Sequence, residues 1–138
     1  MRDPFGAVLT LIRDDPAVAA IVAGRVSSHV EGPPSVQLID NATSRRPFGA
    51  GSGRMGMQSW TGFARCWGPD SPTGAILSRQ LAGAVSDALH NHRPTTVGTT
   101  YIARAYAPEI DGTSRDPDTK WPYADVRLEV HAGADAVA

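Results

Sequence analysis

Two histidines, His90 and His92, have a spacing that could support metal chemistry. A His-x-His pair can bind a transition metal, and with a distant carboxylate it would make a small metal-dependent hydrolase. The pair lies where a helix is predicted to end, and residues i and i+2 of a helix point about 200° apart. No nearby cluster of Cys, Asp or Glu completes four ligands. We therefore interpret both histidines as a solvated helix terminus and predict no metal site.

The only cysteine, Cys66, is the one candidate thiol nucleophile. Its neighbour Arg65 favours a thiolate, but no histidine is close in sequence and no helix N-terminus lies beneath it. We predict that Cys66 is a small buried hydrophobic residue, and a lone cysteine excludes an intrachain disulfide. The chain also has no G-x-S-x-G or H-E-x-x-H motif, so we predict a non-enzyme with no catalytic residue and no cofactor.

A glycine-rich stretch at residues 51–56 spells G-x-G-x-x-G. This fingerprint binds a dinucleotide only between a strand and a helix, whereas a polar segment precedes it here and a strand-like run follows. Arg45, Arg46 and Arg54 are the only local basic excess. They could meet a phosphate or an acidic protein surface, or they could simply be solvated.

Acidic residues gather in the segment 107–120, at Glu109, Asp111, Asp116 and Asp118. Calcium loops need oxygen ligands at fixed spacings with a glycine in register, and this segment does not match that pattern. We interpret it as a solvated loop.

The composition is typical of one domain over residues 1–138. The 14 glycines and 11 prolines indicate long loops between short elements. A net charge of −1 gives no global field that would recruit nucleic acid or an anionic membrane. The longest apolar run, 17–23, is too short to cross a bilayer, and no signal-like segment opens the chain.

Two short helices are predicted at the N-terminus, because Asp3-Pro4 and Asp15-Pro16 are both cap-plus-first-turn pairs. Gly24 is placed to end the second helix in a left-handed turn. The residues expected to be buried are Val8, Leu11 and Ile12 in the first helix and Val18, Ile21 and Val22 in the second.

A longer helix is predicted between Ser71 and His92, with Ser71 as its N-cap, Pro72 in its first turn, and Asn91 and Pro94 as its stop. Its apolar stripe must pack against another element, and the strands predicted before and after it are the candidates. The stripe comprises Leu77, Leu81, Ala84, Val85, Ala88 and Leu89, and the residues expected mostly on the opposite face are Ser78, Arg79, Ser86, Asp87 and His90.

Four strands are predicted, over 35–39, 55–67, 96–106 and 121–132, with possible bulges at Gly56 and Gly62. The last strand has the clearest alternation, with Ala124, Val126, Leu128 and Val130 facing one way and Asp125, Arg127, Glu129 and His131 the other. Two long loops, 40–54 and 107–120, are expected to be mobile or to form interfaces, and 133–138 is expected to be a loose tail. The predicted fold class is therefore α+β: a mainly antiparallel β-sheet with one long helix packed on a face and two short N-terminal helices.

The N-terminal pattern resembles that of a known family. Leu11-Ile12, the run 15–22, Gly24-Arg25-Val26 and Pro33-Pro34 are similar to the N-terminal signature of the tail-terminator (tail-completion) proteins of long-tailed bacteriophages. The layout downstream is similar too, with a β-rich middle ending in Trp67, a capped helix and a closing strand like 125–130. The segment 43–53 departs from the family pattern because it is longer and richer in glycine.

This resemblance implies a virion structural protein, located in the virion tail or neck and in the host cytoplasm during assembly. Such proteins form a ring, typically a hexamer, that caps the tail tube, stops its polymerisation and contacts a neck or connector protein. DNA passes through the lumen without sequence-specific binding, and no membrane is involved.

A ring requires heterologous surfaces on each copy. The residues we predict at a subunit or tube interface are Arg45, Arg46, Arg54, Asp111, Arg115, Asp125, Arg127 and Glu129. Three alternatives stay open: a head-closure or neck adaptor protein, the small metal-dependent hydrolase, and a ligand-binding module with a deep apolar pocket.

Overall fold

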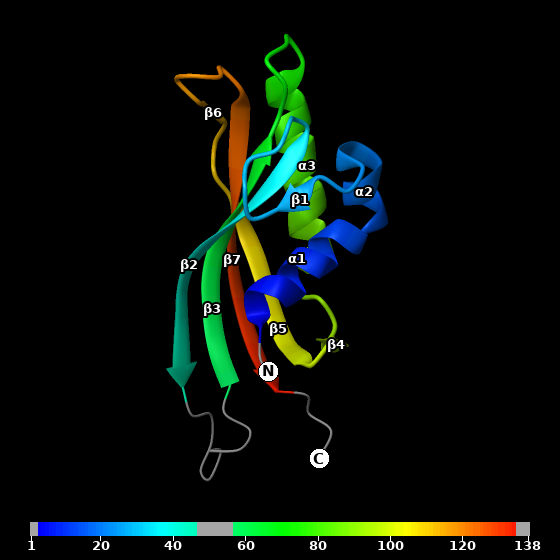
Figure 1. The fold of residues 1–138 in the computed structure, drawn as a ribbon, viewed down its shortest axis with the longest axis vertical. Coiled ribbons are helices and arrows are strands. Elements are labelled where there is room, and N and C mark those ends of the chain that lie inside the picture. The colour runs from blue at the N-terminus through cyan, green and yellow to red at the C-terminus, as the bar shows by residue number, and fades with distance from the viewer. Residues whose placement is uncertain (1–2, 47–56, 135–138) are drawn as a thin grey trace.

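The computed structural model describes residues 3–46 and 57–134, which form one curved sheet with helices packed on it (Figure 1). The helices are α1 (Pro4–Asp14), α2 (Pro16–Val22) and α3 (Gly74–Leu89). The strands are β1 (Val26–Ser27), β2 (Ser35–Arg46), β3 (Met57–Trp67), β4 (Thr95–Val97), β5 (Thr100–Ile110), β6 (Ser114–Arg115) and β7 (Pro122–Ala134). The strand order is β1-β2-β3-β7-β5-β4, and β6 pairs with β7.

The sheet is mainly antiparallel, because only the short β1–β2 pair is parallel. The three helices lie on one face of the sheet (Figure 1), and α3 contacts β7, β5 and β3. The predicted α+β class is therefore confirmed. No helix among the described residues is long and apolar enough to cross a membrane.

The two N-terminal helices begin at the predicted prolines. The Asp3 carboxylate accepts the Gly6 N–H at 2.9 Å, and the Asp15 carboxylate accepts two N–H groups of the first turn of α2 at 3.1 Å. The left-handed turn after α2 starts one residue earlier than predicted, because Ala23 already has a φ of 51° and Gly24 follows with 85°. Of the predicted core residues, Val8, Ile12, Val18 and Val22 are buried, while Leu11 and Ile21 are half-buried against the core.

Helix α3 differs from the prediction at its start. It begins at Gly74 with Thr73 as the N-cap residue, so Ser71 and Pro72 lie in the preceding turn. Ser78, predicted on the polar face, is fully buried, and its hydroxyl donates to the Ala75 carbonyl at 2.8 Å. The helix ends as predicted, with Asn91 in the left-handed region (φ 57°). The buried face comprises Gly74, Ser78, Leu81, Ala82, Val85 and Leu89.

Strand β7 confirms the alternation read from the sequence: its apolar residues 124, 126, 128 and 130 are all buried. It occupies the centre of the sheet, where it pairs with β3 on one side and β5 on the other. It also continues to Ala134, so the predicted tail begins later than residue 133, and 135–138 lie outside the described residues.

The prediction was wrong at two loops and one strand. Strand β2 continues through residues 40–46 of the predicted loop, because β3 supplies a partner for each of these residues except the bulged Asn41. Strand β5 reaches Ile110 and β6 forms at 114–115, so the predicted loop 107–120 is partly sheet. The predicted strand 96–106 is a hairpin, since a turn at Gly98 (φ 60°) separates β4 from β5.

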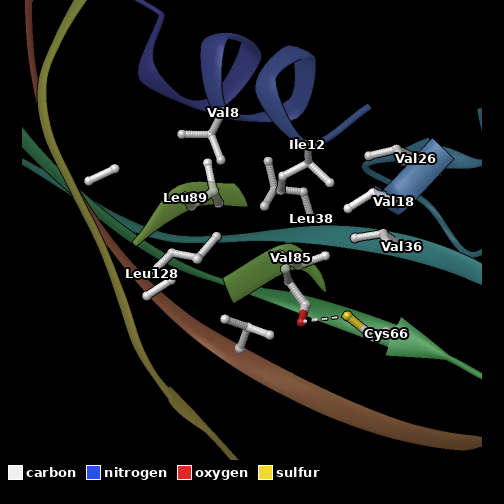
Figure 2. Packing of buried hydrophobic residues seen from close by; sticks show 14 of the residues in the cluster. Val8, Ile12, Val18, Val26, Val36, Leu38, Cys66, Val85, Leu89 and Leu128 are labelled. Atoms are coloured by element: carbon white, nitrogen blue, oxygen red, sulfur yellow. Dashed lines mark hydrogen bonds between the residues drawn. The ribbon is translucent and has the colours of Figure 1, made fainter. Parts of the chain in front are cut away.

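One cluster of buried residues fills the space between helices and sheet. Figure 2 shows Val8 and Ile12 of α1 facing Leu89 of α3 and Leu38 of β2. The largest fully buried side chain is Trp60, whose indole Nε1–H donates to the Asp40 carboxylate at 2.8 Å. Leu38 and Trp60 therefore identify the face of β2 and β3 that packs against the helices.

Candidate subunit interface

The sheet face opposite the helices, here called the polar face, is built by period-two alternation along β3, β5 and β7. Apolar side chains at even positions of β7 enter the core, so odd positions must point away from the helices. The side chains on the polar face include Thr61, Phe63 and Arg65 of β3, Tyr106 and Glu109 of β5, and Tyr123, Asp125, Arg127, Glu129 and His131 of β7.

Arg65 and Asp125 form the strongest polar contact of this face. They lie directly opposite each other on β3 and β7, and the guanidinium donates to both carboxylate oxygens at 2.9 and 3.0 Å. The hydrogen bonds to Asp125 raise the pKa of Arg65. The guanidinium also stacks 4.2 Å from the centre of the Tyr123 ring. Asp125, predicted at an interface, is therefore bound within its own chain with only 14% of its side chain exposed.

Arg127 lies between two carboxylates, Glu109 at 3.6 Å and Asp111 at 3.4 Å. All three side chains are largely exposed, and exposed ion pairs of this kind contribute little to stability. Glu129 approaches His131 on the same strand at 3.4 Å. The structure thus brings the predicted interface residues Asp111, Arg127 and Glu129 together on or beside the polar face, where they remain accessible to a partner.

A hollow of about 260 Å³ opens between these charges. Its apolar lining includes Phe63, Tyr106 and Pro108, while Glu109, Arg127 and Glu129 are its charged members. Apolar side chains surrounded by charged ones are typical of surfaces that contact another protein. The sequence analysis did not single out Phe63 or Tyr106 as site residues, because their meeting depends on the register that places β3 and β5 on either side of β7.

Arg115 lies apart from this group, at the start of the β6–β7 connection. Its guanidinium donates to the Lys120 carbonyl at 2.9 Å and lies 3.8 Å from Asp70. Nearby, Asp116 accepts the N–H groups of Asp118 and Thr119, and the hydrogen bonds from Thr119 lower the pKa of its carboxyl group. The Asp116 carboxylate therefore closes a hydrogen-bonded turn within this acidic segment.

The predicted arginine cluster is only partly described. Arg45 and Arg46 lie in β2 opposite Gln58 and Met57, but their side chains are outside the described part of the chain. Arg54 and the G-x-G-x-x-G letters at 51–56 also lie outside the described residues. The interface role of all eight predicted residues stays a prediction.

The two histidines have structural partners. His90 caps α3, and its Nδ1 accepts the Ala107 N–H at 3.1 Å, while the Nδ1 of His92 lies 2.7 Å from the Arg93 carbonyl. Within residues 3–46 and 57–134, no group of three or more His, Cys, Asp or Glu side chains could hold a metal ion. Cys66 is buried as predicted, and burial raises the pKa of its thiol.

Comparison with known proteins shows a similarity of fold. No family model matches the chain, and no curated protein matches it. A solved structure titled "Virion of native gene transfer agent (GTA) particle" contains a chain that superposes with a TM-score of 0.68, and the match covers 94% of both chains at 18% sequence identity. The α+β fold described here is therefore shared, along nearly its whole length, with a chain of that virion particle.

Proposed function

We propose that this chain is a structural protein of a phage-like virion and acts there as a tail terminator. In this role, copies of the chain form a ring on the end of the tail tube, stop its polymerisation and present a surface to the neck of the capsid. The single observation that carries the proposal is the shared fold with a chain of a gene transfer agent virion, which extends over 94% of both chains.

Two further observations support the terminator role. The N-terminal residues, from the helix around Leu11 to Pro33-Pro34, resemble the signature of tail-terminator proteins. The polar face carries charges of both signs around an open hollow, which suits contact with a protein surface better than the enclosure of a small substrate.

Electron microscopy of the purified protein, alone and mixed with headless tails, tests the proposal. We expect rings in the protein alone or at the tail ends, and light scattering after size exclusion then gives the copy number. Rings that bind the portal-side adaptor and ignore tail tubes would favour the alternative of a head-closure or neck protein. A monomer that binds neither component, and that carries a stoichiometric metal in a metal assay, would overturn the proposal in favour of the hydrolase.

A further inference from the structure

The two edges of the sheet differ in how their outward backbone groups are hydrogen-bonded. The outer edge of β5, beyond its pairing with β4, is covered by the end of α3. The Asn91 N–H donates to the Ala105 carbonyl at 2.9 Å, the Ala107 N–H donates to His90 Nδ1 at 3.1 Å, and the Ser86 hydroxyl donates to the Ala107 carbonyl at 2.5 Å. These contacts satisfy backbone groups that would otherwise offer a template to another strand.

Within residues 3–46 and 57–134, only the short strand β1 pairs with the outer edge of β2. Strand β1 pairs only with Val36 and Gln37, where the Val36 N–H donates to the Arg25 carbonyl at 2.9 Å. Beyond this point β2 continues to Arg46 as the outermost strand (Figure 1), and no described strand pairs with the outer edge of residues 39–46. A long, open edge strand is a surface that proteins either block or pair.

The opposite edge at the same end of the sheet is β4. The registers place Arg45, Gln58, Ala132, Ile102 and Thr95 in one row across five strands, so β2 and β4 are the two outer strands of this end. Val97 and Thr100 flank the two-residue turn of the β4–β5 hairpin, and such flanking residues exchange backbone hydrogen bonds. By alternation, Thr96 directs its N–H and C=O away from β5.

We propose that the open edge of β2 pairs with the β4 edge of a second copy of this chain. Four antiparallel steps separate β2 from β4, so the two strands run in the same direction. Rotation about a ring axis preserves that direction, and the pairing between copies is therefore parallel, as β1–β2 already is. This inference rests on the proposed ring, in which each copy would cover the edge of the next and leave no open edge, as closed barrels do.

The matched pair Thr96→Pro and Thr96→Ala tests the pairing. Proline removes the outward N–H of an edge position and adds its ring there, while the hydrogen bonds to β5 stay intact. Alanine removes the same side chain but keeps the N–H. We expect Thr96→Pro to lose self-association in light scattering at every concentration at which the wild type assembles, and Thr96→Ala to assemble as the wild type does.

Hydrogen exchange on the wild-type chain gives an independent readout, which holds even if Thr96→Pro is too unstable to interpret. In the monomer, about half of the amides in 38–46 should exchange rapidly, because alternate residues face outward. These amides should become protected on assembly, while a peptide covering 103–107 should be protected in both states. Assembly that leaves 38–46 unprotected, a Thr96→Pro variant that assembles normally, or a wild type that stays monomeric throughout would each overturn the inference. Capping of tails seen by microscopy is scored separately, so the proposed function can stand when this pairing fails.

Discussion

Replacing Gly62 with alanine should destabilise the chain, because this residue lies where β2, β3 and the Trp60 indole meet. Gly62 pairs with Asp40 beside the bulge in β2. A methyl group at Gly62 would come within 2.5 Å of the Ile39 carbonyl oxygen and 2.5 Å of the Trp60 ring. Neither neighbour can move freely, since the first is backbone and the second is fully buried and hydrogen-bonded to Asp40.

The magnitude follows from these contacts. Inserting a methyl group into a well-packed site costs about 1–3 kcal/mol, and a displaced indole would also weaken a hydrogen bond worth about 1 kcal/mol. We therefore expect a loss of about 2–3 kcal/mol in the free energy of unfolding. For a chain of this length, the melting temperature should fall by roughly 6–15 °C.

Thermal and urea unfolding followed by circular dichroism measure the effect, at one protein concentration because self-association adds stability. Gly83→Ala is the matched control: Gly83 lies inside α3, and a methyl group there meets nothing within 4 Å. This control should gain up to about 1 kcal/mol from helix propensity. A Gly62→Ala variant that melts with the wild type, or a Gly83→Ala variant that loses stability, would refute the reasoning.

Three further substitutions follow from buried or half-buried contacts. Arg65→Lys keeps the charge but loses the two-pronged contact with Asp125, and urea unfolding should show a loss of about 1–2 kcal/mol; equal stability would contradict the importance of the fork geometry. Burial raises the pKa of the Cys66 thiol, so the folded chain keeps this proton to a higher pH than the unfolded chain does. The free energy of unfolding should therefore fall as pH rises past about 9, by up to roughly 1.4 kcal/mol per pH unit, and Cys66→Ala should lack this component; identical pH slopes would count against it. Ser86→Ala removes a donor to the Ala107 carbonyl and should cost about 1 kcal/mol in urea unfolding, whereas no loss would mean that water replaces the hydroxyl.

The sequence predicted elements well where local patterning and tertiary packing agree. Strand β7 was predicted almost to its ends because Val126, Leu128 and Val130 alternate strictly with charged residues. The starts of α1 and α2 were predicted because each Asp-Pro pair supplies both the N-cap residue and the first residue of the helix. These signals are complete within a few residues of sequence.

The errors lie where a distant partner decides the structure. Asp40 and Asn41 have low strand propensity, yet β2 runs through them because β3 pairs with Asp40 and again from Ala42 to Arg46, which leaves only Asn41 bulged. Ser78 looks polar in sequence, but its hydroxyl is satisfied by the turn before it, which removes the cost of burial. The sequence predicted the polar face from the alternation in β7 alone. It did not predict that Arg65 of β3 and Tyr106 of β5 share this face, because that depends on how the strands pair.

The central position of β7 has a consequence for synthesis. Strand β7 follows β3 and β5 in the chain and pairs with both, so a nascent chain that lacks β7 holds two separate halves of a sheet. We expect productive folding to wait until residues 122–134 have been made, because the long-range contacts of the fold depend on this strand. Chains stalled before Pro122 should then be substrates for chaperones and proteases, because the strand that joins the two halves of the sheet is still missing.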